Sequence, residues 1–314
     1  METAINENKN QVLFHEKRNA DVKGTFFVGV TKMAVLTIIS VLFVILGIIV
    51  YQGWDMFSWE FLSSFPTDGM TKGGIFPALI GTFILVIIMS IAAVPFGTIT
   101  AIYLTEYAKE NSKIAAAVRF SVRTLAMVPS IIFGLFGLGF FIHFIGQGAD
   151  NVFNGGELHW AQPNILWASL TMSLLTLPVI IVSVEEVLKT IPRELREASL
   201  ALGATKWQTI KNVVLPGSVS GIMTGTILAV SRGAGEVAPI LFTGAAYYLA
   251  TLPQSVSDQF MNLGYHIYIM STQSSDVEKT MPIQFATTLV LLMLTLSLNL
   301  VAVLIRSRIR RRAK

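Results

Sequence analysis

Six long apolar runs, separated by polar segments, occupy most of the chain. A helix needs about 20 mostly apolar residues to cross the hydrocarbon core of a membrane, and each run is close to that length or longer. The runs cover residues 33–51, 74–104, 125–145, 165–184, 213–243 and 283–305. The pattern therefore predicts an all-α membrane protein with six transmembrane helices, and a transmembrane domain over residues 33–305.

The polar segment between the fourth and fifth runs carries helix signals of its own. Pro192 suits a first helical position, and Gly203 suits the left-handed residue just past a helix end. The hydroxyl of Thr205 can cap a second short helix. We therefore predict two short helices within residues 185–212, which form a protruding knuckle at the end of two spans. Protruding helices of this kind dock into grooves on partner proteins.

The basic residues predict the orientation of the spans, because cytoplasmic loops retain Lys and Arg. Twenty of the 23 lie in four segments that alternate spans place on one side: the tail 1–32, the loops after the second and fourth spans, and the tail 306–314. Only Lys72 and Lys279 fall on the other side, and Arg232 lies inside a span. We expect a multi-pass protein of the cytoplasmic (inner) membrane, with both termini and the knuckle in the cytoplasm. The basic tail is a topology signal that contacts anionic lipid, not a nucleic-acid site.

The amino-acid composition is typical of a membrane protein and excludes several kinds of site. With 53% hydrophobic residues, 13% charged residues and a mean hydropathy of +0.64, the chain has too few charges to cover a soluble globule. It has no cysteine, which excludes disulfides, thiolate metal sites and a cysteine nucleophile. Residues 1–32 lack the apolar core of a cleaved signal, so we expect the first span to be an uncleaved anchor.

Arg232 is a charged residue within the fifth apolar run. A charge within an apolar span is costly unless it is compensated, and such charges usually mark function. Glu236 follows four residues later, on the same helix face and within salt-bridge reach. The two form either a neutralised structural pair or a site on a water-filled path, where the guanidinium meets an oxyanion such as phosphate. Gly233 and Gly235 are expected to loosen the helix there, and Pro239 to break it one turn later.

Prolines and small residues are placed unevenly in the other spans. Small residues at intervals of three let helix backbones approach, which is our interpretation of the glycines in the second and third spans. For Pro129-Ser130 and for Pro178, the alternatives are helix packing and a bend that lines a polar path. Ser130 is therefore a candidate residue of the substrate path. The loop 246–282 on the outer side, with Tyr265 and His266, is expected to include an interfacial piece.

Familiar catalytic motifs are absent from the sequence. There is no G-x-x-x-x-G-K-[ST] loop, no H-E-x-x-H and no G-x-S-x-G, and the four histidines are too scattered for a metal cluster or a triad. We therefore assign no catalytic residue, no metal and no cofactor to this chain. A six-span protein with a docking knuckle and no nucleotide loop of its own is expected to receive energy from a partner.

The knuckle resembles the signature of a known family. Glu197-Ala198-Ser199-x3-Gly203-x9-Val213-x-Leu215-Pro216 is similar to the E-A-A-x3-G-x9-I-x-L-P signature of permease subunits in ABC importers of the type I fold. Ser199 replaces the second alanine, and Val213 replaces the isoleucine. The resemblance implies a coupling helix at Glu197 through Gly203, with Leu195, Ala198 and Leu202 on the face that docks to an ATPase.

Further segments resemble the permeases of phosphate transport systems, in particular those of the PstA type, over about residues 70–305. The matching segments are Ala93-Val94-Pro95-Phe96-Gly97, Ile102 to Tyr107, Val128-Pro129-Ser130-Ile131, Leu177-Pro178-Val179, Ser231-Arg232 to Pro239, Leu252-Pro253-Gln254 and His266-Ile267-Tyr268. The family's Arg-Ala-Ile-Gly-Glu-Thr stretch is altered here at Gly233, Ala234 and Val237.

The resemblance implies a complete transport mechanism. A PstA-like chain pairs with a PstC-like permease to form the pore, two PstB-like ATPase subunits bind the knuckles, and a PstS-like phosphate-binding protein docks outside. ATP is then bound and hydrolysed on the partner subunits, and this chain itself is not an enzyme. Inorganic phosphate is expected to pass Arg232 and Glu236 on its way in.

Two rival hypotheses stay open at this stage. One is an importer permease for another oxyanion, such as molybdate, sulfate or phosphonate. The other is a channel or an intramembrane enzyme that works without an ATPase.

Overall fold

The computed structural model describes residues 22–109, 111–274 and 276–312, and these fall into two compact units that are divided between Tyr51 and Gln52. The helices are α2 (Val22–Gly53), α3 (Trp59–Ser63), η1 (Asp68–Met70), α4 (Phe76–Ile102), η2 (Tyr103–Tyr107), α5 (Lys113–Leu125), α6 (Ser130–Phe136), η3 (Gly137–Gly146), α7 (Gln147–Phe153), α8 (Ile165–Lys189), α9 (Arg193–Ala201), α10 (Lys206–Thr209), η4 (Ile210–Val214), α11 (Leu215–Ala234), α12 (Leu263–Gln273) and α13 (Val277–Arg312). The strands are β1 (Pro66–Thr67) and β2 (Lys72–Gly73), paired antiparallel with Pro66 opposite Gly73.

Six helical stretches among the described residues are long and apolar enough to cross a membrane, which confirms the predicted number. They are Gly24–Gly53, Phe76–Tyr107, Ser130–Phe153, Ile165–Lys189, Lys206–Ala234 and Val277–Val301.

The described part of the first unit is helix α2 up to Tyr51, and most of its apolar side chains are exposed. The helix begins at Val22, whereas the pattern placed the start of the span at Met33. Lys32 does not interrupt it, because a long lysine side chain can carry its charge away from an apolar surface. Of the predicted tail 1–32, residues 1–21 lie outside the described part of the chain.

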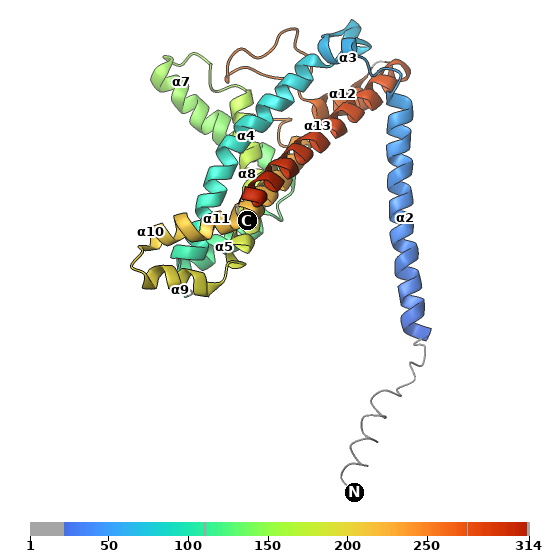
Figure 1. Cartoon of the computed structure of the whole chain (residues 1–314). Helices are drawn as coiled ribbons and strands as arrows, with labels where there is room; N and C mark the ends of the chain where they lie inside the picture. The colour runs from blue at the N-terminus through green and yellow to red at the C-terminus, as the bar shows by residue number, and fades with distance from the viewer. Residues whose placement is uncertain (1–21, 110, 275, 313–314) are drawn as a thin grey trace. The chain divides into compact units, whose positions relative to one another are not determined.

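In the second unit, helices α4, α8, α11 and α13 pack side by side, with α4 and α8 in the most extensive contact (Figure 1). Small residues let these helices approach, as expected. A Cβ on Gly97 of α4 would lie 2.6 Å from Ile180 Cγ2 of α8, and a Cβ on Gly221 of α11 would lie 2.5 Å from Val187 Cγ1. The hydroxyl of Ser173 also donates to the Met89 carbonyl across the α4–α8 contact, at 3.1 Å.

The third span is displaced from its predicted position of 125–145. Residues 113–125 form a separate amphipathic helix, α5, capped by Ser112, and the chain breaks before Pro129, which disfavours helical backbone at the preceding residue. The span then runs through α6, the π-helical η3 and α7. Pro129 thus precedes a helix and does not bend one, whereas Pro178 lies buried inside α8.

The third span extends as far as Phe153 because its one carboxylate is fully satisfied. Asp150 is buried and accepts hydrogen bonds from the backbone amides of His159, Trp160 and Ala161, at 2.7–3.0 Å. The side chain of Asn154 donates a further bond of 2.8 Å. A carboxylate with this many donors can be placed at the end of an apolar helix. It also draws the loop after α7 back onto that helix.

The fifth span ends at Ala234 and does not continue to residue 243. Gly235 caps α11, and residues 236–244 follow as a series of turns. The turns pack on α6, because a Cβ on Gly134 would lie 3.0 Å from the Pro239 carbonyl oxygen. The apolar character of residues 235–243 thus reflects burial in an irregular segment and not a longer helix.

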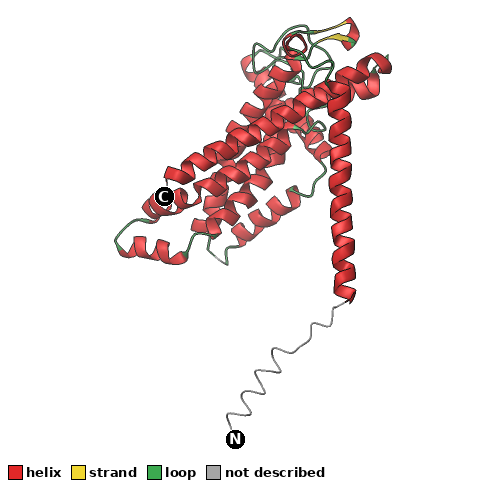
Figure 2. Ribbon diagram, turned by 45° about the vertical axis from the view of Figure 1, so that its right-hand side comes forward, coloured by secondary structure: helices red, strands yellow, loops and turns green. Residues whose placement is uncertain are grey.

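The two ends of the second unit differ in structure. Helices α5, α9 and α10 and the carboxyl end of α13 lie at one end, and α3, the β1–β2 hairpin and the long loops lie at the other (Figure 2). At the loop end, α12 is held to α4 by a hydrogen bond of 2.9 Å from the Leu263 amide to the Thr82 hydroxyl. The segment that the sequence assigned to an interfacial piece is therefore a docked helix, and its His266 is buried.

Candidate functional site

The knuckle consists of α9 and α10, joined by a turn at Gly203. Helix α9 begins at Arg193, because Pro192 has extended backbone and precedes the helix instead of opening it. Gly203 has a φ of +85°, a conformation that glycine adopts at little cost. Thr205 and Gln208 then form a reciprocal capping box, with the Thr205 amide donating to Gln208 Oε1 at 2.7 Å. The two-helix knuckle and its glycine turn are as predicted.

The outer face of α9 is open to solvent. None of the residues of α9 is buried. Leu195, Ala198 and Leu202 share one face by their spacing, and Leu202 is 90% exposed. Glu197 and Gly203 are exposed as well. An exposed apolar stripe on a protruding helix is typical of a surface that a partner covers.

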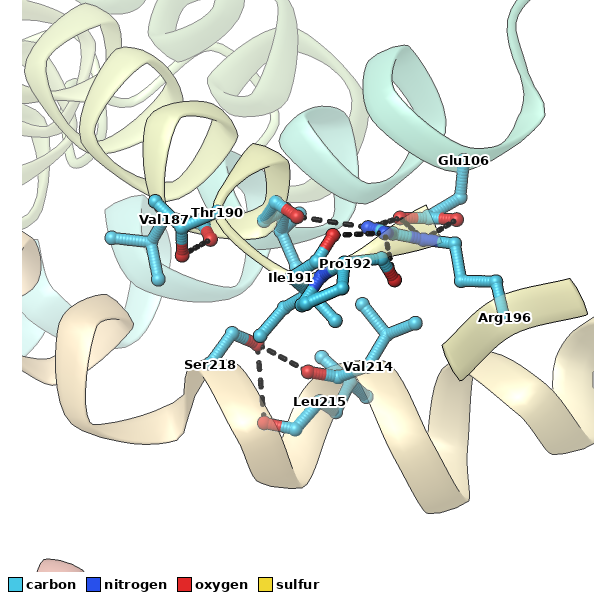
Figure 3. Close-up of polar contacts among 10 residues, drawn as sticks. Glu106, Val187, Thr190, Ile191, Pro192, Arg196, Val214, Leu215 and Ser218 are labelled. Atoms are coloured by element: carbon cyan, nitrogen blue, oxygen red, sulfur yellow. Dashed lines mark hydrogen bonds and ion pairs between the residues drawn. The ribbon is translucent and has the colours of Figure 1, made fainter. Parts of the chain in front are cut away.

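The other face of α9 is fixed to the helix bundle by Arg196. Its guanidinium points from α9 to the carboxylate of Glu106 in η2, with Nη2 2.8 Å from Oε1 (Figure 3). It also donates to the carbonyl group of Leu188 in the last turn of α8 and to that of Ile191, which follows the helix. The two side chains are only 18% and 8% exposed. Arg196 thus joins the knuckle to the ends of two spans.

A second arginine makes a parallel connection. Arg119 of α5 donates from Nε to Glu185 of α8 at 2.9 Å and from Nη2 to the Leu104 carbonyl at 2.6 Å. Lys189 also pairs with Glu185, at 2.8 Å. The sequence pattern predicts no role for Arg119, Arg196 or Glu106. All three lie near the ends of spans on the same predicted side of the membrane, which is consistent with ion pairs there, but their spacing does not predict which residues pair.

Of the charged pair of the fifth run, Arg232 lies in the last turn of α11, whereas Glu236 follows the end of that helix, so the two do not share a helix face as expected. Arg232 Nε is 3.8 Å from Glu236 Oε1, and the side chains are 69% and 25% exposed. A cation at the carboxyl end of a helix is stabilised by the helix dipole. The guanidinium is therefore not enclosed by this chain's own helices, and a ligand or a second chain can reach it.

Residues next to Arg232 fix this turn to its neighbours. Ser231 Oγ lies 2.6 Å from Asn299 Oδ1 of α13, a hydrogen bond that the sequence analysis did not anticipate. A Cβ on Gly233 would lie 2.8 Å from Met89 Sδ and 3.0 Å from Thr176 Cγ2. Gly233 therefore allows close packing of α11 against α4 and α8. Gly235 instead caps the helix end.

Ser130 is partly buried at the amino end of α6. One turn later, Gly134 packs on Pro239, which follows Glu236 by three residues. No hydrogen bond within the described ranges joins Ser130 to Arg232 or Glu236. The structure therefore brings Arg232 and Glu236 together and leaves Ser130 on α6, which packs on the turns after Glu236 through Gly134.

Comparison with protein families gives one match across most of the chain. Residues 93–313 match the family described as binding-protein-dependent transport system inner membrane component. The match includes the knuckle, Arg232 and Glu236.

Several relatives are similar over more than half of their length. The chain is 27% identical to the probable ABC transporter permease protein YqgI of Bacillus subtilis (strain 168) over 266 residues, which cover 81% of this chain and 85% of that protein. It is 33% identical to the phosphate transport system permease protein PstA 1 of Mycobacterium tuberculosis (strain CDC 1551 / Oshkosh) over 224 residues, or 70% and 67% of the two chains. Identity to PstA of Yersinia pestis is 37% over 179 residues, or 57% and 55% of the two chains.

Solved structures with a similar fold are chains of ABC transporters. A bacterial ABC transporter involved in the import of the acidic polysaccharide alginate matches with a TM-score of 0.61 and 16% identity, over 92% of this chain and 98% of that one. The MetNI methionine ABC transporter, in an inward-facing conformation, matches with a TM-score of 0.51 and 19% identity, over 77% and 94%. At these identities the similarity establishes the fold alone.

Proposed function

Since the chain belongs to the family of inner membrane components of binding-protein-dependent transport systems, we propose that it is the permease subunit of an ATP-driven importer of inorganic phosphate. The six spans and the fold of importer permeases fit that role. Phosphate as the substrate is supported by the similarity to permeases named for phosphate transport. The observation that carries the proposal is the exposed guanidinium of Arg232 within a membrane span.

Arg232 provides the chemistry that phosphate requires. Its guanidinium stays charged at physiological pH and offers a planar set of donors that matches two oxygens of an oxyanion. The carboxylate of Glu236 is 3.8 Å away, too far for a short hydrogen bond, so it lowers the local positive potential without occupying the donors. A passing phosphate is therefore attracted but not held tightly. Ser130, on the neighbouring α6, is a further residue of the proposed path.

The knuckle is the proposed site of coupling. Ala198 and Gly203, with the apolar side chains of Leu195 and Leu202, form a surface that a separate ATPase subunit covers. Glu197, the remaining predicted coupling residue, lies on the opposite side of α9, facing the spans. Force on α9 passes through Arg196 to Glu106 and to the end of α8. That partner binds ATP, and this chain moves in response and provides the path for phosphate.

The proposed assembly contains four further subunits. A PstC-like permease completes the pore, two PstB-like ATPase subunits cover the knuckles, and a PstS-like phosphate-binding protein docks on the opposite side. The knuckle and both termini face the cytoplasm, as the distribution of basic residues indicates.

Uptake of radiolabelled phosphate tests the proposal. A strain that lacks this chain should lose ATP-dependent phosphate uptake, and the gene supplied in trans should restore it. Unlabelled phosphate should compete, whereas molybdate, sulfate and phosphonate should not. Competition by one of those anions, but not by phosphate, would assign the importer to that anion. Recovery of the chain without any ATPase subunit would contradict an ATP-driven importer.

A further inference from the structure

A cavity of about 730 Å³ lies between the knuckle and the ends of the spans. It is bounded by α9, the end of α8, α5 and the segment from Leu104 to Lys109. A volume of this size holds a group as large as a lipid headgroup. None of the proposed functions of Arg232 or of the docking face uses it.

Cationic side chains dominate the lining of this cavity. Five of them line it, Lys109, Arg119, Lys189, Arg193 and Arg196, against the carboxylates of Glu106 and Glu197. Glu185 adds a third carboxylate, because it pairs with Arg119 and Lys189, so the described residues place five cations against three carboxylates. The cavity thus attracts negative charge.

The two kinds of cation have different roles in the cavity. Arg119 and Arg196 donate to Glu185, Glu106 and backbone carbonyl groups. They therefore add positive potential to the cavity and hold its walls together. Lys189 forms an ion pair with Glu185, but its side chain is 59% exposed. Lys109 is also exposed. An ammonium group has three donors on a flexible stem. The two lysines can therefore turn to an incoming anion.

The cavity lies at the boundary between membrane and water. Its walls include the last residues of two candidate spans, which end at Tyr107 and at Lys189. Tyr103 and Tyr107, on either side of the lining residue Leu104, are exposed, and exposed tyrosines at span ends are typical of the headgroup region. Basic pockets between spans at this depth suit the phosphate groups of anionic lipids.

The cavity is separate from the docking face of α9. Arg193, Arg196 and Glu197 line it, and their spacing places them on the side of α9 opposite Leu195, Ala198 and Leu202. An occupant would therefore lie between α9 and the spans, and a partner could cover the outer face at the same time.

We propose that this cavity binds a phosphate group, carried by an anionic phospholipid or present as free inorganic phosphate, with Lys109 and Lys189 as its contacts. The proposal does not depend on which solute the protein transports. A group bound there would strengthen the contact between the knuckle and the spans.

The test uses the full-length chain with its copurifying subunits, in nanodiscs. One arm measures enrichment of phosphatidylglycerol over phosphatidylcholine around the protein, and the other measures binding of radiolabelled inorganic phosphate in pure phosphatidylcholine. The variant is Lys109→Gln with Lys189→Gln. The matched control is Lys113→Gln with Lys211→Gln, two exposed lysines outside the cavity lining. Lys109→Arg with Lys189→Arg keeps the charge and shows whether any loss is due to misfolding.

We expect the cavity variant to lower binding about 30-fold, because each of the two cations contributes about fivefold to binding an anionic surface. The control and the charge-retaining variant should bind as the unchanged protein does. A loss confined to phosphatidylglycerol assigns the group to lipid, and a loss of phosphate binding assigns it to the free anion. Equal binding by the cavity variant and the control in both arms would overturn the proposal, as would a loss that the Lys→Arg variant shares.

Discussion

Arg196 of the knuckle and Glu106 at the end of the second span are joined by an ion pair of 2.8 Å, although they lie 90 residues apart in the sequence. The pair is largely buried, and the same guanidinium binds carbonyl groups at the end of the fourth span. Movement of α9 therefore cannot leave the second and fourth spans unaffected.

The first prediction concerns this pair. Glu106→Gln should lower the free energy of unfolding by on the order of 3 kcal/mol, because removal of one partner leaves a buried charge without compensation. Thermal unfolding of the purified protein measures this. Lys279→Gln removes an exposed pair with Asp276, and should lower the free energy of unfolding far less, because solvent screens exposed ion pairs. Similar losses in the two variants would show that Arg196 does not depend on Glu106.

Arg232→Gln should abolish phosphate uptake, because a neutral amide attracts an oxyanion far more weakly than a guanidinium does. The side chain is exposed, so the variant should assemble normally. Uptake of radiolabelled phosphate and copurification of the ATPase are measured together. Arg232→Lys keeps the charge without the planar donors and should retain partial uptake. Normal uptake by Arg232→Gln would remove the proposed anion path.

Gly203→Asp should detach the ATPase from the knuckle. The φ of +85° costs a side chain about 1–2 kcal/mol, and the new carboxylate adds charge to the docking surface. A Cβ at this position meets no atom within 4 Å, so a steric clash inside the chain is not the cause. Gly203→Asn tolerates this backbone better and brings no charge, and should keep most of the binding. Intact copurification with Gly203→Asp would count against docking at this turn.

His266 predicts a pH dependence of stability. Burial lowers the pKa of its imidazole from 6.5 to about 4, and its Nδ1 has no hydrogen-bond partner among the described residues. Between those pH values the unfolded chain binds the proton and the folded chain does not, so stability falls as pH decreases from 6.5 to 4. The loss approaches roughly 3 kcal/mol. Melting temperatures from pH 4 to 8 measure it, and His266→Phe should remove this contribution; an unchanged slope would assign it to another group.

The features that could be predicted from the sequence are those that depend on a few neighbouring residues. The six apolar runs, the left-handed Gly203 and the Thr205 cap each depend on local spacing. The end of the fifth span was missed because residues 235–243 remain mostly apolar, although they form turns that pack on Gly134 of a distant helix. The Arg196–Glu106 and Ser231–Asn299 contacts were missed because their partners come from distant helices.

Asp150 gives the loop end of the protein a fixed contour. One carboxylate gathers three successive amides, so the stretch around Trp160 takes its shape from a residue of the span itself. The solute-binding protein that we propose to dock on this side would therefore contact a segment whose backbone is already ordered before binding.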